Sequence, residues 1–106
     1  MEEKEVYEDL FDQLIADNSD VNPGVMMRDP ALKWQGKVFV FYYAQAKAMC
    51  FKLGKEYVIE NHGIHDYDFL SPFKKKPPMY AWFIVGDRHQ PVWEELAYVA
   101  LEAMRH

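Results

Sequence analysis

The sequence predicts a two-layer α+β domain, in which helices pack on an antiparallel sheet. Apolar runs bounded by turn residues lie between residues 31 and 53 and again from Met79 to Val85, and such runs are typical of strands. Short connections within residues 31–53 favour a three-stranded meander, which is an antiparallel arrangement. Helical spacing of apolar residues near both ends of the chain predicts helices that flank this sheet.

Each end of the chain has the pattern of an amphipathic helix. Residues 3–16 are the first candidate, and the last helix is expected to begin near Pro91, where the missing N–H of proline is not needed. Both segments place apolar residues three or four positions apart, so each presents one apolar stripe to the sheet. The two stripes are Val6, Tyr7, Leu10, Phe11, Leu14 and Ile15, and Val92, Trp93, Leu96, Ala97, Ala100 and Met104.

The two clearest strands, Lys37–Tyr43 and Met79–Val85, are apolar at every second residue and also at the residues between them. A sheet with one solvated face alternates apolar and polar residues, because successive side chains point to opposite faces. Both faces of this sheet are therefore expected to need covering. Helices cover one face, so we expect a partner or a second copy to take the other.

The first hairpin turns at Gln35-Gly36-Lys37, where Gly36 supplies the positive φ that a two-residue loop needs. Either tight loop, Gln35-Gly36 or Gly36-Lys37, gives the same parity. Side chains expected on one face are Leu32, Trp34, Phe39 and Phe41.

The second connection, around Ala44 to Lys47, leaves its register open. A four-residue loop puts the next strand's residues Met49, Phe51 and Leu53 on the face of Val38, Val40 and Tyr42. A loop of odd length puts them with Phe39 and Phe41 instead, because a slip of one residue exchanges the faces.

The remaining segments are assigned mainly to loops. Residues 17–24 are dense in turn formers and predict a loop, followed by a short strand at residues 25–27. Residues 55–61 predict a short helix that stops at Gly63, and residues 64–78, with three prolines, predict a long loop.

Length and composition exclude several classes of protein. A chain of 106 residues fits a single domain, residues 1–106, and the net charge of −5 argues against a nucleic-acid binder. We identify no membrane span and no signal peptide. Cys50 is the only cysteine, which fits a reducing compartment, so we expect a cytoplasmic protein.

Three groups of residues are candidates for chemistry. His62, His65 and Asp66, with His89 as a further ligand, are the nearest approach to a metal site, but Gly63 argues against one helical face and a solvated loop is favoured. Cys50 is a candidate nucleophile, although its apolar neighbours favour a buried hydrophobe. The run Lys74–Lys76 is a candidate for an anionic partner, against a solvated loop as the simpler interpretation.

Four motifs in order resemble the TfoX N-terminal domain family, which includes a competence regulator and short standalone relatives. They are Met26-Met27-Arg28 before a proline, Gly36-Lys37-Val38-Phe39, Phe51-Lys52-Leu53, and Phe69-Leu70-Ser71-Pro72 leading to Met79-Tyr80-Ala81-Trp82. The closing segment Trp93-Glu94-Glu95-Leu96-Ala97 also resembles the family's last helix. The resemblance implies a standalone N-terminal domain whose fold is similar to the secretion-chaperone-like and YjbR-like folds, and it implies no catalytic residues.

From these observations we expect a non-enzymatic regulatory or protein-interaction domain without a cofactor. The expected partner is another protein or a second copy in a homodimer, with no role for a membrane or nucleic acid. The expected interaction surface is Val38, Val40, Tyr42, Lys74, Lys75 and Lys76. The alternative is a small-ligand or metal-binding protein or enzyme that uses the loop of His62, His65 and Asp66.

Overall fold

The computed structural model describes residues 3–106, with side chains from Val6 onward, and it confirms the predicted α+β fold. Within this range a six-stranded antiparallel sheet has the order β1-β2-β3-β4-β6-β5. The elements are α1 (Glu3–Asp17), β1 (Val21–Met26), β2 (Asp29–Trp34), β3 (Lys37–Tyr43), β4 (Ala48–Lys52), β5 (Asp68–Leu70), β6 (Met79–Gly86) and α2 (Gln90–Arg105). Short 3-10 turns are η1 (Ala44–Ala46), η2 (Ile59–His62) and η3 (Asp87–His89). In the described part of the chain, no helix combines the length and apolar character needed to span a bilayer.

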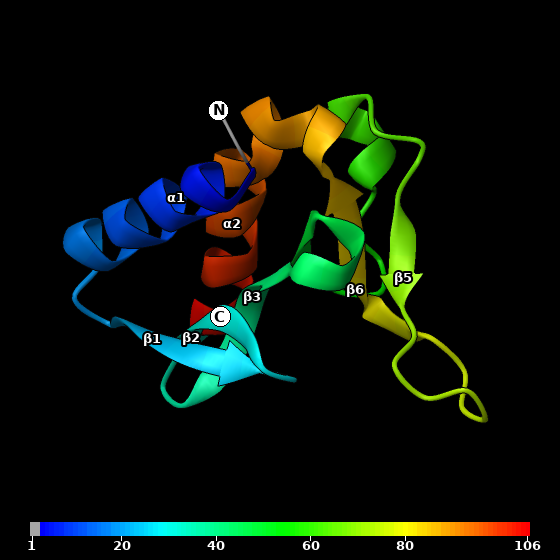
Figure 1. Ribbon diagram of the computed structural model, residues 1–106, viewed down its shortest axis with the longest axis horizontal. Coiled ribbons are helices and arrows are strands. Elements are labelled where there is room, and N and C mark those ends of the chain that lie inside the picture. The colour runs from blue at the N-terminus through cyan, green and yellow to red at the C-terminus, as the bar shows by residue number, and fades with distance from the viewer. Residues whose placement is uncertain (1–2) are drawn as a thin grey trace.

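Both helices pack against the same face of the sheet, which holds the main core (Figure 1). Leu14 of α1 and Leu96 of α2 are fully buried there, together with Met49 and Phe51 of β4. Trp93 is also buried, and its indole N–H donates to the carbonyl of Gly86 at 3.2 Å. A buried tryptophan normally finds a hydrogen-bond partner, and this contact ties the first turns of α2 to the end of β6.

A β-bulge in β3 changes the predicted parity of the first hairpin. The loop is Gln35-Gly36, one of the two predicted alternatives, since Trp34 pairs with Lys37. Pairing then shifts from Lys33–Val38 to Leu32–Val40, which leaves Phe39 as the extra residue. Phe39 and Val40 consequently both enter the helix-covered core.

The prediction that Phe41 shares a face with Leu32, Trp34 and Phe39 is therefore wrong. Phe41 lies on the opposite face, in a second cluster of buried residues, while the other three belong to the main core. The bulge could not be seen in the sequence, because both parities of β3 are apolar.

The connection between β3 and β4 has the four-residue length that was one of the two alternatives. Tyr43 pairs with Ala48, so the loop is residues 44–47, and η1 forms within it. Met49 and Phe51 consequently share the helix-covered face with Val40 and Tyr42. Val38 does not join them, because the bulge separates it from Val40.

The face without helices closes largely on its own side chains. Its buried residues are Ala31, Phe41, Cys50, Leu70 and Trp82, framed by half-buried Met26, Val38, Tyr43, Ala81 and Ile84. The rings of Phe41 and Trp82 lie 5.6 Å apart, and those of Phe41 and Tyr43 lie 5.9 Å apart. Burying this cluster does not require a partner, which corrects the expectation that one must cover it.

Strands also occupy parts of two segments that were predicted to be loops. β1 overlaps the short strand predicted at residues 25–27, but it begins earlier, at Val21, and contains Pro23 and Gly24, which an edge strand tolerates because one row of its backbone groups faces away from the sheet. A Cβ at Gly24 would lie 2.4 Å from the Lys33 side chain, so the glycine leaves room for that lysine to cross β1. β5 is the other edge strand, and its three residues pair with β6.

The predicted helix at residues 55–61 is wrong except at its end, where η2 stops at Gly63 as expected.

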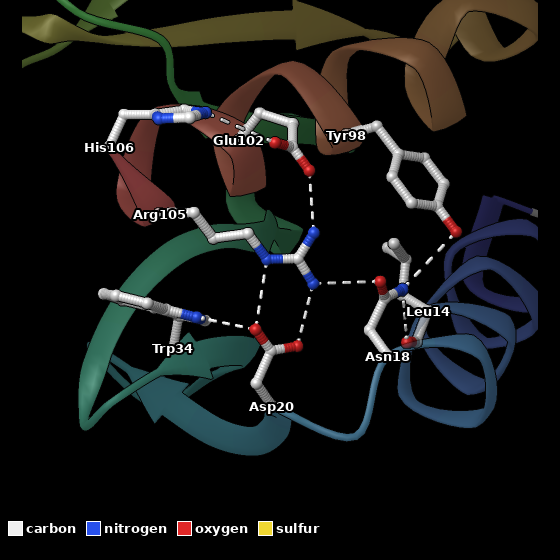
Figure 2. A network of polar contacts seen from close by, with 8 residues as sticks. All are labelled: Leu14, Asn18, Asp20, Trp34, Tyr98, Glu102, Arg105 and His106. Carbon is white, nitrogen blue, oxygen red and sulfur yellow. Dashed lines mark hydrogen bonds and ion pairs between the residues drawn. The ribbon is translucent and has the colours of Figure 1, made fainter.

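A polar network ties the end of α2 to the connection between α1 and β1 (Figure 2). Arg105 donates from Nε and Nη2 to the two carboxylate oxygens of Asp20, at 3.0 and 2.8 Å. Trp34 donates to the same carboxylate at 2.8 Å, and Arg105 also donates to Asn18 at 3.1 Å. A bidentate arginine–carboxylate pair is stronger and more directional than an ordinary surface ion pair. The network therefore joins α1, β2 and α2 at one corner.

Relieving strain in the β1–β2 turn is expected to stabilise the fold. Met27 and Arg28 have φ values of 50° and 74°, where a side chain costs about 1–2 kcal/mol per residue. The double substitution Met27→Asn with Arg28→Gly supplies the preferred residues of a type I′ turn, and we expect it to raise the free energy of unfolding by about 1–2 kcal/mol. Urea denaturation measures this change. Gly36→Ala is the matched control, expected to lower the same quantity by about 1 kcal/mol because Gly36 has φ 80°; an unchanged midpoint in both variants would contradict the turn geometry.

The corner network is expected to fail in acid. Hydrogen bonds from Arg105 and then from Trp34 lower the pKa of Asp20 from 3.8 to about 2. Because the folded-state pKa is depressed, the contribution of Asp20 is complete above about pH 4 and disappears as the pH falls through about 2. Asp20→Asn should lower the melting temperature at pH 7 and leave it nearly unchanged at about pH 2. Equal losses at both pH values would show that the carboxylate charge does not stabilise the fold.

Candidate functional site

The predicted metal trio of His62, His65 and Asp66 is not brought together. His62 faces α2, where its Nδ1 lies 3.4 Å from the Glu95 carboxylate, and Asp66 instead contacts His89 at 2.5 Å. His65 is exposed. Among the described residues, no three His, Cys, Asp or Glu side chains are grouped in a way that could hold a metal ion.

The histidines instead fasten the segment of residues 57–68 to the start of α2. The Tyr57 hydroxyl lies 2.5 Å from Nε2 of His62, so a proton on Nδ1 faces Glu95 and leaves Nε2 to accept from the phenol. Burial, and then the Glu95 carboxylate, raise the pKa of the Tyr57 phenol. A phenol is protonated at neutral pH, so Tyr57 acts as a hydrogen-bond donor here.

A similar contact holds the neighbouring turn. The hydrogen bond from His89, and then the charges of His89 and Arg88, keep the pKa of Asp66 below its usual value. Arg88 also donates to the same carboxylate, at 3.2 Å. Neither of the two cavities beside α1 is lined by His62, Asp66 or His89. These contacts therefore join the η2–β5 segment to η3 and α2.

Cys50 is placed as a buried hydrophobe. Its thiol lies fully buried in the cluster of the helix-free face, beside Phe41, and burial raises its pKa far above the usual value. A nucleophilic cysteine needs a thiolate at neutral pH, and this environment opposes ionisation. The structural interpretation of Cys50 fits this placement.

The predicted interaction surface divides into two parts. Val40 and Tyr42 are buried under the helices, and the Tyr42 ring stacks on Tyr7 of α1 at 4.2 Å, so these two residues cannot line an exposed surface. This corrects the expectation for them, and the reason is the β-bulge that turns Val40 and Tyr42 toward α1. Val38 remains half-buried on the helix-free face.

The lysine run, in contrast, lies in an exposed loop that projects from the body between β5 and β6 (Figure 1). Exposed apolar side chains surround it: Phe73 is 56% exposed, Tyr80 is 48% exposed and Met79 is 37% exposed. The Lys76 ammonium lies 5.1 Å from the centre of the Phe73 ring. Tyr80 packs edge-on against Phe69, with ring centres 5.1 Å apart, which anchors this part of the loop to the sheet.

Two further lysines extend this patch. The backbone N–H groups of Leu53 and Gly54 donate to the carbonyl of Ala81 at 2.9 and 3.1 Å, so the segment after β4 runs beside the start of β6. Lys52, the last residue of β4, pairs with Trp82 of β6, and Lys55 lies in the segment that follows. We name the whole patch the basic aromatic surface: Lys52, Lys55, Phe73, Lys74, Lys75, Lys76, Met79 and Tyr80.

Cations and carboxylates are segregated in the described part of the molecule. The described ion pairs with arginine use Arg88 and Arg105, whereas none of the cations between Arg28 and Lys76 forms one. From Val6 to Asp17, α1 carries four carboxylates and no cation, at Glu8, Asp9, Asp12 and Asp17. Since no carboxylate among the described residues forms an ion pair with the lysines of the basic aromatic surface, these lysines can attract an external anion.

Comparisons with protein-family models, curated proteins and solved structures found no match to this chain.

Sequence analysis identified Lys74, Lys75 and Lys76 but missed Lys52, Lys55 and the aromatic part of this surface. The segment from Ser71 to Tyr80 contains Phe73 and Tyr80 on either side of the lysine run, with Pro72 before Phe73 and with Pro77 and Pro78 after the lysines. Prolines restrict the backbone and disfavour helix or central strand, which was the signal that Phe73 lies on a loop. The exposure of both rings depends on the sheet edge, which the sequence does not define.

The burial of Cys50 predicts a slow thiol reaction. In native buffer, modification by a chromogenic disulfide reagent requires local or global opening, so we expect it to be at least about a thousandfold slower than in the unfolded chain. Stopped-flow absorbance with and without concentrated guanidinium measures both rates. Rapid modification in native buffer would contradict the burial and reopen a chemical role for Cys50.

Proposed function

We propose that this chain is a non-enzymatic interaction domain that binds an acidic partner protein through the basic aromatic surface. The observation that carries the proposal is the coincidence of lysines that form no ion pair among the described residues with exposed aromatic and methionine side chains, in the projecting loop and at the start of β6. Aromatic and methionine side chains are enriched at protein interfaces, whereas lysine is depleted at their centres and contributes at the rim. The loop has this composition, with apolar anchors and cations around them.

The overall charge favours a protein partner over nucleic acid. The chain has a net charge of −5, so its long-range field repels a polyanion such as DNA even though this loop is basic. A short acidic segment with apolar residues, in contrast, contacts only the basic aromatic surface. The resemblance to the TfoX N-terminal domain family, which implies no catalytic residues, supports the same proposal.

Fluorescence anisotropy with a labelled peptide tests the proposal. The probe is a short synthetic peptide rich in glutamate with two phenylalanines, titrated with the purified chain. Charge reversal in Lys74→Glu/Lys75→Glu/Lys76→Glu should weaken binding by about tenfold or more, because it replaces several rim attractions with repulsions. Phe73→Ser tests the apolar anchor and should also weaken binding, since Phe73 is the most exposed ring of the surface.

The control is a charge change at lysines that lie outside the basic aromatic surface. Lys37→Glu/Lys47→Glu changes charge at two exposed lysines outside the basic aromatic surface, and it should leave peptide affinity within about twofold. A single-stranded oligonucleotide is titrated in parallel. Equal loss in the control variant, or tighter binding of the oligonucleotide than of the peptide, would reject an acidic protein as the partner.

A further inference from the structure

The outer side of α1 has the chemistry that the basic aromatic surface would recognise. A cavity of about 300 Å³ lies between α1 and the start of α2. Its apolar lining comes from Val6, Leu10, Pro91 and Trp93. The acidic residues Asp9 and Glu94 also line the cavity. This combination suits an aromatic side chain that enters the cavity beside a cation that remains at the rim.

A second cavity flanks α1 on the side of β1 and β2. It has a volume of about 220 Å³ and is lined by Tyr7, Phe11 and Pro23 among others, with Glu8 and Asp12 beside it. The exposed side chains of α1 thus form an acidic ridge between two apolar grooves. Burial, and then the Glu8 and Asp29 carboxylates, raise the pKa of Tyr7, which is consistent with a negative potential there.

We infer that the acidic partner is a second copy of this chain, whose Phe73–Lys76 loop seats in the groove between α1 and α2 while its lysines contact Asp9, Asp12 and Glu94. The inference rests on the proposed function and names its partner. Phe73 is the anchor for the apolar groove, and the three lysines that follow it match the carboxylates on the ridge. Both surfaces are exposed, and no described ion pair occupies the loop lysines or the ridge residues.

The loop cannot reach the groove of its own molecule. Figure 1 shows α1 and the β5–β6 loop at opposite ends of the molecule, so the contact has to form between copies. Because the two surfaces differ, the contact is heterologous: each copy offers one loop and one groove. Such head-to-tail contacts produce open chains or closed rings. Since the contact is largely electrostatic at its rim, it is expected to weaken with salt.

Sedimentation velocity of the purified chain over a concentration series is the first test. At about 20 mM salt we expect species larger than a dimer that grow with concentration, and at about 500 mM salt mostly monomer. Two variants separate the surfaces. Lys74→Ser/Lys75→Ser/Lys76→Ser removes the loop charge and leaves the groove intact, whereas Asp9→Lys/Asp12→Lys reverses the ridge and leaves the loop intact. Each variant alone should remain monomeric at low salt.

Mixing the two variants gives the decisive result. The intact loop of the ridge variant fits the intact groove of the loop variant, and neither complex has a further pair of functional surfaces. We therefore expect a one-to-one dimer that does not grow with concentration. A symmetric contact predicts something different: a loop-to-loop or groove-to-groove dimer would persist in one variant alone, and that outcome overturns the inference.

Controls protect the test against unfolding and against nonspecific charge effects. Asp87→Lys changes charge at an exposed residue outside the groove and should associate like the parent chain. Circular dichroism confirms that each variant folds, and Glu94→Lys, on the α2 side of the groove, replaces the ridge variant if α1 is destabilised. A chain that binds the acidic peptide but stays monomeric at low salt refutes the second copy and leaves the proposed function standing, whereas loss of peptide binding refutes the proposed function itself.

Discussion

Two helices can cover only one face of a six-stranded sheet, and the rest of this structure follows from that constraint. α1 and α2 lie on the same face and bury its core. The opposite face receives no helix, so it closes with its own large side chains, mainly Phe41 and Trp82. This smaller cluster explains why the strands are apolar on both faces although only one face carries helices.

The β-bulge at Phe39 adapts the third strand to this unequal division. An extra residue in β3 lets two successive side chains, Phe39 and Val40, enter the main core, while Val38 and Phe41 remain on the helix-free face. A regular strand would alternate and place one of the successive pair on the outer face. The bulge therefore shifts apolar volume toward the helices, where α1 stacks Tyr7 on Tyr42.

Local patterns predicted the elements whose signals lie within their own residues. The apolar stripes gave both helices, the continuous apolar runs gave β3 and β6, and Gly36 gave the first hairpin loop. β5 and the first part of β1 were missed because an edge strand needs only one neighbour and tolerates residues such as Pro23 that normally interrupt a sheet. Their existence depends on β2 and β6, which lie elsewhere in the chain.

The residues of the candidate site were likewise predictable only where the signal lies within their own segment. His62, His65 and Asp66 are close in the sequence, but spacing does not determine side-chain direction, and Gly63 separates His62 from the other two in a left-handed turn. Lys74–Lys76 were found because a charge run is visible without a fold. The aromatic part of the surface could not be predicted, because the exposure of Phe73 and Tyr80 depends on the fold.

The separation of charge is the feature that connects this fold to its proposed role. Stability alone favours carboxylates near cations, as at the corner where Arg105 binds Asp20. Among the described residues, the lysines of the basic aromatic surface have no such partner, and like charges in one loop repel each other. Lys74, Lys75 and Lys76 thus contribute little to folding, while their charges remain available to an anion. The acidic ridge of α1 has the opposite charge and likewise forms no ion pair within the described part of the chain, so the two surfaces are electrostatically complementary.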